Sequence, residues 1–159
     1  MRLSTKGRYA VMAMVDLAAN SNGHPVALAD IAERQEISLS YLEQLFAKLR
    51  KGGLVKSVRG PGGGYLLAHT ADATRISDII LAVDEPIRTT RCANITPQGC
   101  RTNRSRCLTH DLWEELGNQI HMYLSSVTVA DVVERRVIGT SAFTVKPVPE
   151  ADSAAVAAE

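Results

Sequence analysis

The sequence predicts a mainly α-helical fold with one small β-hairpin. Apolar residues recur at helical spacing in several segments, and two short apolar segments flank a glycine-rich turn. Hydrophobic residues make up 45% and charged residues 22% of the 159 positions, as expected of a chain that folds into a globular domain. Aromatic residues make up only 4%, so we expect a core of Leu, Ile, Val, Ala and Met.

Six segments are predicted to be helical. Ser4 or Thr5 can cap the first helix, and Gly52 and Gly53 end the third. The third helix has apolar residues at the i, i+3, i+4, i+7 spacing of a helix that packs on one side. Thr128 can cap the last helix. The expected helices are residues 5–20, 28–35, 40–51, 76–83, 108–125 and 128–136.

A β-hairpin is predicted between the third and fourth helices. Residues 54–58 and 65–67 are its strands, joined by a turn that contains four glycines. Two helices with a short turn, followed by such a hairpin, is the order of a winged helix-turn-helix. We therefore predict a winged helix-turn-helix domain at residues 1–84, with the helix-turn-helix at residues 28–51 and the wing at residues 54–68.

The outward face of the third predicted helix carries polar residues suited to the edge of a DNA duplex. At about 100° per residue its leucines face inward, so Glu43, Gln44 and Lys51 face outward. Gln can pair with adenine, Glu can accept a hydrogen bond from cytosine, and Lys can contact phosphates. In the wing, Arg59 adjoins glycines that let the backbone approach a phosphate. The predicted DNA-binding residues are Arg2, Ser40, Tyr41, Glu43, Gln44, Lys48, Lys51, Arg59 and Gly60.

Three other interpretations compete with DNA binding, of which two are structural and one is another binding function. Ser40 and Glu43 match a capping box, in which Glu43 would bond to the start of its own helix. The cations at positions 48, 50 and 51 could form an ordinary solvated helix end. The alternating glycines of the turn could form a dinucleotide-binding loop, but no helix begins directly after them, which disfavours that interpretation.

Three cysteines and a histidine form the pattern C-x7-C-x6-C-x2-H at Cys92, Cys100, Cys107 and His110. The histidine lies about one helical turn after the last cysteine, so both can face one point. Three thiolates and an imidazole can hold zinc or an iron–sulfur cluster. Residues 86–110 contain five arginines and no acidic residue, a charge that would lower the pKa of the thiols. The alternative is that the three cysteines bind no metal, which their position in a polar, arginine-rich segment disfavours.

An apolar stripe on the fifth predicted helix favours a dimer. Leu112, Leu116, Ile120 and Leu124 recur on one face of a helix that is too long for a small domain to cover. A partner helix would bury this face and give an isologous homodimer, which would bind a palindromic DNA site. The expected organisation after the first domain is a ligand-binding loop at residues 85–107, dimerisation helices at residues 108–136 and a disordered tail at residues 137–159.

The sequence also argues against several classes of protein. No apolar run reaches the roughly 20 residues of a membrane span, and the first residues do not form a signal peptide. We therefore expect a cytoplasmic protein without a membrane partner. The chain has neither a nucleophile–base constellation nor a CxxC redox pair, which argues against an enzyme.

Four stretches resemble the iron–sulfur regulators of the IscR branch, which belongs to a wider family of small winged-helix regulators. These stretches are residues 1–10, 37–46, 57–65 and 107–113, and the resemblance covers about residues 1–136. The glycine motif of the wing marks the wider family, whereas the three cysteines and the histidine mark the branch.

The resemblance implies a transcription regulator, repressor or activator, that binds double-stranded DNA as a homodimer and controls genes for cluster assembly. It also implies one [2Fe–2S] cluster per subunit, delivered by iron–sulfur assembly proteins, with Cys92, Cys100, Cys107 and His110 as ligands, and a role for Glu43 in the choice of DNA site. The ligand loop is about three residues longer than in that pattern, which costs little entropy but leaves the stability of the cluster open. A zinc-binding winged-helix regulator and an iron–sulfur carrier without DNA binding are the alternatives.

Overall fold

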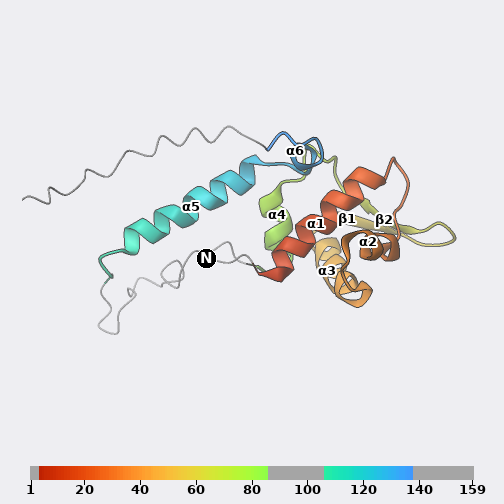
Figure 1. Ribbon diagram of the computed structural model, residues 1–159, viewed down its shortest axis with the longest axis horizontal. Coiled ribbons are helices and arrows are strands. Elements are labelled where there is room, and N and C mark those ends of the chain that lie inside the picture. Colours follow the sequence, from red (N-terminus) through yellow and green to blue (C-terminus); the bar gives the residue numbers. More distant parts are fainter. Residues whose placement is uncertain (1–3, 86–105, 138–159) are drawn as a thin grey trace, which may run out of the picture.

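The computed structural model describes residues 4–85 and 106–137, and these residues form a mainly helical fold with a two-stranded antiparallel hairpin (Figure 1). The predicted fold class is therefore confirmed. Every predicted helix and strand is present, with ends that differ by at most three residues from the expected ones. The elements are α1 (Thr5–Asn20), α2 (Leu28–Gln35), α3 (Leu39–Lys51), β1 (Val55–Val58), β2 (Gly64–Leu67), α4 (Ile76–Ala82), α5 (His110–Ser126) and α6 (Val129–Val133).

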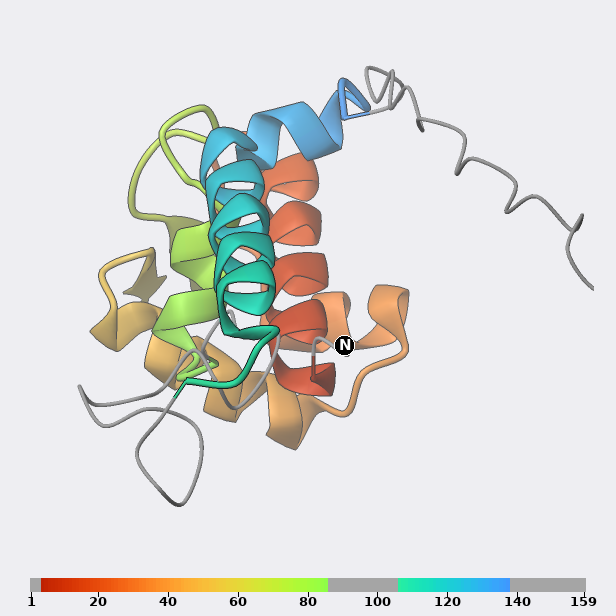
Figure 2. The same ribbon diagram turned by 90° about the vertical axis from the view of Figure 1, so that its left-hand side faces the viewer.

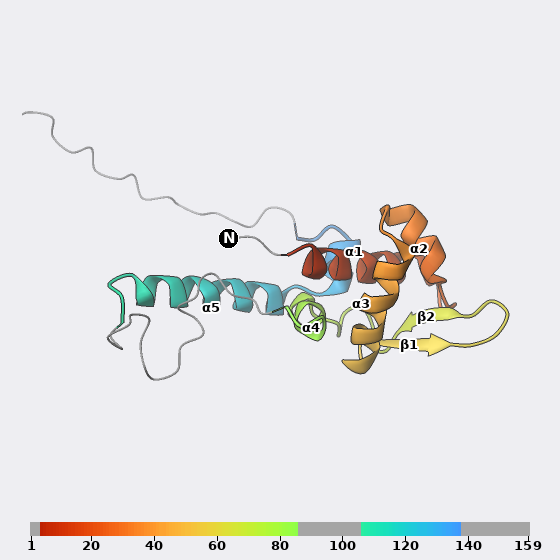
Figure 3. The same cartoon turned by 90° about the horizontal axis from the view of Figure 1, so that it is seen from below.

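The elements divide into a compact group and one extended helix. Helices α1 to α4 and the hairpin pack together, while α5 extends away from this group and contacts it mainly through α4 (Figures 1 and 3). Helix α6 returns the chain to α1, as the view from the α5 end shows (Figure 2). In the described part of the chain, no helix is both long and apolar enough to cross a membrane.

The core is aliphatic, as the composition predicts. Helix α1 presents a row of small and medium side chains to the core, and α3 presents the row that the sequence periodicity predicts. Phe46 is fully buried and meets Tyr65 of β2 edge-on, with ring centroids 4.9 Å apart. The fully or almost fully buried side chains of α1, α3 and α4 include Ala10, Ala13, Met14, Leu17, Leu42, Leu45, Phe46, Leu49, Ile79 and Ile80.

The wing is anchored to the connection that precedes α2. Val26 and Tyr65 exchange two backbone hydrogen bonds, of 3.0 and 2.8 Å, and so add a bridge beside the hairpin. A Cβ atom on Gly64 would lie 2.3 Å from the carbonyl oxygen of Val26, too close for any side chain. Glycine at this position therefore lets the wing approach the helix-turn-helix.

A buried carboxylate joins α1 to α2. Asp16 is only 6% exposed and accepts hydrogen bonds from Nε and Nη2 of Arg34, the shortest of 2.6 Å, and from Nε2 of Gln35 at 2.7 Å. The hydrogen bond to Asp16 raises the pKa of Arg34 against the opposing effect of its burial, and the charges of Asp16, Asp30 and Glu33 add to the rise. A buried charge is stable only when it is paired and hydrogen-bonded, so this contact fixes the position of α2 on α1.

Removing Arg34 is expected to destabilise the protein more than removing an exposed arginine does. In Arg34→Ala the buried charge of Asp16 keeps only its bond from Gln35, and we expect a loss of about 2 kcal/mol in the free energy of unfolding. Urea unfolding followed by circular dichroism measures this loss. Arg8→Ala is the control, because Arg8 is exposed on α1 and should cost less than about 0.5 kcal/mol. Equal losses in the two variants would contradict the assigned role of Asp16.

Candidate DNA interface and ligand segment

Helix α3 separates an apolar face from a polar face. Leu42, Leu45, Phe46 and Leu49 are buried against α1, α2 and the hairpin. The opposite face is open to solvent over almost four turns, and it carries the polar residues expected from the sequence. Its exposed residues are Ser40, Glu43, Gln44, Ala47, Arg50 and Lys51.

The predicted capping box at the start of α3 does not form. The helix begins earlier than expected, with Ser38 as its N-cap, and Ser38 makes no side-chain capping bond. Ser40 consequently lies within the first turn of the helix and cannot act as its cap. Among the described residues, Glu43 makes no hydrogen bond or ion pair, so its carboxylate is exposed on the polar face rather than bonded to the helix start. The capping interpretation of Glu43 is therefore wrong.

Two of the predicted DNA-binding residues have partners within the protein. Tyr41 packs edge-on against Tyr9 of α1, with ring centroids 6.0 Å apart and ring planes at 85°, so its ring also supports the helix. Lys48 donates a hydrogen bond of 2.7 Å from Nζ to Oδ2 of Asp84, which follows α4. This bond and the charge of Asp84 raise the pKa of Lys48, although desolvation acts in the opposite direction.

The wing presents its turn to solvent. Arg59 and Gly60 are exposed, and Gly60 has φ of +108°, a conformation that glycine adopts without strain. A Cβ atom on Gly63 would lie 2.5 Å from the carbonyl oxygen of Val58, so the turn is tight as well as exposed. One predicted DNA-binding residue, Arg2, lies outside the described residues.

The start of α1 is held by a carboxylate that the sequence analysis missed. Ser4 caps the helix as predicted, accepting from the backbone N–H of Lys6 at 3.2 Å. In addition, Glu85 accepts from the backbone N–H and the hydroxyl of Ser4 and from the backbone N–H of Gly7 at 2.7 Å. Partial burial would raise the pKa of Glu85, but these hydrogen bonds and the charge of Lys6 outweigh burial and lower it. No local pattern reveals such a cap, because its donors lie 78 and 81 positions away.

Two of the four predicted metal ligands are described, and they share one turn of backbone. The N–H of His110 donates to the carbonyl oxygen of Cys107 at 3.0 Å, where α5 begins. The His110 side chain is buried, whereas Cys107 is half-buried, with Sγ 3.8 Å from Oγ1 of Thr109. Cys92 and Cys100 lie outside the described residues. The described half of the ligand set thus has a thiol and an imidazole within one turn.

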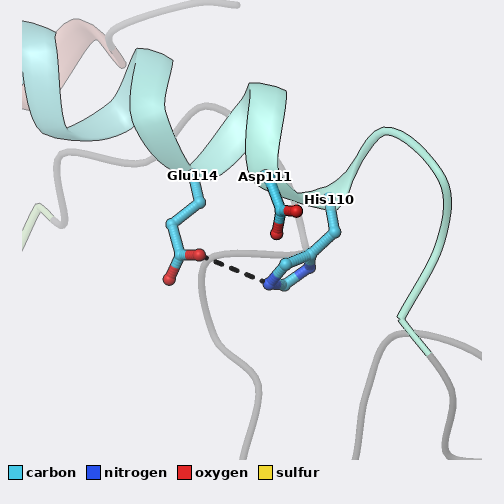
Figure 4. Close-up of side chains that lie close together, drawn as sticks. All are labelled: His110, Asp111 and Glu114. Atoms are coloured by element: carbon cyan, nitrogen blue, oxygen red, sulfur yellow. Dashed lines mark ion pairs between the residues drawn. The ribbon is translucent and has the colours of Figure 1, made fainter.

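Acidic residues on α5 adjoin the histidine. Nε2 of His110 lies 3.6 Å from Oε2 of Glu114, one turn along the helix (Figure 4). One ligand atom each from His110, Asp111 and Glu114 lie within 4.8 Å of one another. A metal-bound histidine commonly has a carboxylate near its other ring nitrogen, and Glu114 is placed for that role. The role of Glu114 was not predicted from the sequence, although its i+4 spacing from His110 was a usable signal.

The apolar stripe on α5 is largely uncovered. Leu112 is 61% and Leu116 is 36% exposed, while Leu124 packs partly against the core. An apolar groove of about 380 Å³ lies beside Leu124, where α1 and α4 adjoin α5, and its lining includes Val11, Met12, Ile76 and Ile80. Exposed apolar side chains thus lie along α5, and an apolar groove adjoins its last turns at α1 and α4.

A winged helix-turn-helix with a polar face on α3 defines a class of small transcription regulators. Residues 3–135 match the family model described as Rrf2, iron-dependent transcriptional regulator, and the chain belongs to this family. It is 55% identical over 136 residues to the HTH-type transcriptional regulator IscR of Yersinia pestis, covering 86% of this chain and 81% of that protein. The resemblance stated from the motifs is thereby confirmed, and the chain is a transcription regulator rather than an enzyme.

Solved structures give the same assignment. IscR of T. potens superposes with a TM-score of 0.68 at 40% sequence identity, covering 86% of this chain and 88% of that one. CymR, the global cysteine regulator of B. subtilis, superposes with a TM-score of 0.70 at 34% identity, covering 85% of this chain and 98% of that one.

The cap formed by Glu85 predicts an acid-sensitive part of the stability. Because the pKa of Glu85 is lowered on folding from about 4.5, its contribution is complete above that value and is lost as the pH falls below it. Glu85→Gln should lower the free energy of unfolding by roughly 1 kcal/mol at neutral pH and by much less near pH 3. Urea unfolding at both pH values measures the difference. A difference that stays constant with pH would show that the carboxylate charge has no part in the cap.

Proposed function

We propose that this chain binds a palindromic site on double-stranded DNA as a homodimer, through α3 and the wing. The observation that carries the proposal is the exposed polar face of α3, on which Glu43 and Gln44 have no role in holding the fold. An α-helix fits the major groove, where amide and carboxylate side chains can distinguish base edges. Lys51 and Arg59 are exposed cations that can contact the phosphates on either side.

The exposed stripe of α5 supports the homodimer. Exposing large apolar side chains to water is unfavourable in free energy, and a second copy of α5 would cover those of this helix. The groove beside Leu124 would extend the same contact onto α1 and α4. A two-fold axis through this region would place two copies of α3 on one duplex, which is the reason for expecting a palindromic site.

We further propose that Cys92, Cys100, Cys107 and His110 hold a [2Fe–2S] cluster. Cys107 and His110 lie within one turn and are suitable donors for such a cluster. The 55% identity to a relative named IscR supports the same assignment. When bound, such a cluster would supply a centre that responds to oxygen and to iron supply. Iron–sulfur assembly proteins would deliver it in the cytoplasm, and the genes for cluster assembly would be the regulated targets.

The DNA-binding surface can be tested by charge reversal. The triple variant Gln44→Glu, Lys48→Glu, Arg59→Glu is expected to bind any duplex at least about 100-fold more weakly, because it replaces one base contact and two phosphate contacts by repulsion. Fluorescence anisotropy at several salt concentrations measures the affinity and its salt dependence. Arg135→Glu changes an exposed arginine after α6 and serves as the control, with little effect expected. Unchanged affinity of the triple variant for every duplex would refute the proposed interface.

The ligand set can be tested by removing one thiol. Anaerobically purified wild-type protein should be coloured and contain iron and sulfide, whereas Cys107→Ala should lose the visible absorbance. The variant should still sediment as a dimer, because the stripe on α5 is unchanged. Precipitation or unfolding of Cys107→Ala would instead indicate a structural metal site.

Zinc is the second candidate ligand for this segment, because α5 offers further donor atoms beside His110. His110, Asp111 and Glu114 offer the nitrogen and oxygen donors that zinc accepts. The same anaerobic preparation distinguishes the two metals, since a colourless protein with one zinc per chain would support the zinc-binding regulator. A coloured protein that binds no duplex at any salt concentration would support the iron–sulfur carrier.

A further inference from the structure

The turn after α4 directs two successive carboxylates to two different helices. Its backbone is fixed by bonds from the N–H of Asp84 to the carbonyl of Leu81 at 3.0 Å and from the N–H of Glu85 to the carbonyl of Ile80 at 3.3 Å. Asp84 has φ of +57°, a conformation that aspartate tolerates better than most residues do. As a result Glu85 reaches the start of α1, while Asp84 reaches the outer part of α3.

Asp84 lies among lysines, two of which, Lys48 and Lys51, belong to the candidate DNA interface. Its Oδ2 accepts a hydrogen bond of 2.7 Å from Nζ of Lys48, and both side chains are solvent-accessible, at 76% and 39% exposure. The bond and charge of Lys48 act most strongly to lower the pKa of Asp84, and the charges of Lys6 and Lys51 act in the same direction. The carboxylate therefore partly neutralises a basic patch formed by the ends of α1 and α3.

We infer that Asp84 is an intramolecular competitor for DNA phosphate. In the free protein it accepts a hydrogen bond from the ammonium group of Lys48. An arriving phosphate competes with it for that group, because two anions near one exposed ammonium repel each other. This inference rests on the proposed DNA binding, and it assigns to Asp84 the role of lowering the affinity for DNA. The effect on sequence preference is indirect. Asp84 lowers the affinity for the DNA backbone, which is the same for every sequence, so contacts to the bases contribute a larger share of the binding energy.

The exposure of the pair suits competition rather than structural support. An exposed ion pair stabilises a protein little, so a phosphate can displace the carboxylate without unfolding the turn. The pair of Asp16 and Arg34 is different, because its carboxylate is buried and accepts four hydrogen bonds. The turn that positions Asp84 is held by backbone bonds and by Glu85, so a neutral side chain at position 84 should leave it intact.

The test uses the full-length protein and a fluorescein-labelled duplex of mixed sequence. Asp84→Asn should bind this duplex roughly two- to fivefold more tightly than the wild type does at low salt. The slope of log affinity against log salt should steepen by up to about 0.9, the value for one additional phosphate contact. Asp72→Asn removes the same charge at an exposed position near Arg136 and should show neither effect. Equal thermal melting curves confirm that the variants are folded.

A second background separates competition from a general change in charge. In Lys48→Met, the further change Asp84→Asn should raise the affinity no more than Asp72→Asn does. An equal gain in both backgrounds, or unchanged or weaker binding by Asp84→Asn alone, would overturn the inference while leaving the proposed DNA binding intact. If the wild type binds no duplex at any salt concentration, the proposed function fails and the inference fails with it.

Discussion

The packing of the apolar row of α3 is the constraint on which the other features of the candidate interface depend. Leu42, Leu45, Phe46 and Leu49 are buried together, so the helix cannot rotate about its axis without exposing them. This fixes the polar row on the opposite side and keeps Glu43 and Gln44 in solvent. Phe46 also touches Tyr65, and through this contact the same core sets the position of the wing relative to the helix.

Around this core, buried and exposed charges have different physical roles. Asp16 is buried and fully bonded, so it holds α2 against α1 at a fixed position. Asp84 is exposed and meets Lys48 in solvent, where an ion pair is weak and exchangeable. Glu85 lies between these cases and caps α1 from the end of α4. The adjacent residues 84 and 85 thus connect the end of α4 with both α1 and α3.

The sequence predicted the helices, the hairpin and the two faces of α3, because each depends on a local period or on a local turn. It also predicted the caps at Ser4 and Thr128, whose partners are at most three residues away. The capping box at Ser40 was wrong, since the same short motif can lie inside a helix when an earlier residue begins it, as Ser38 does here. The motif defines the spacing of two side chains but leaves the helix boundary open.

By itself, the sequence determined the secondary structure, the amphipathic faces and the clustering of cysteines with His110 in one short stretch. Only the tertiary structure decided which distant charges meet: Lys48 with Asp84 across 36 positions, and Glu85 with Ser4 across 81. It also showed that Glu114 adjoins His110 and that the stripe on α5 is left uncovered by the compact group. The physical reason is that periodicity fixes the direction of side chains along one element, whereas contacts between elements depend on how the whole core packs.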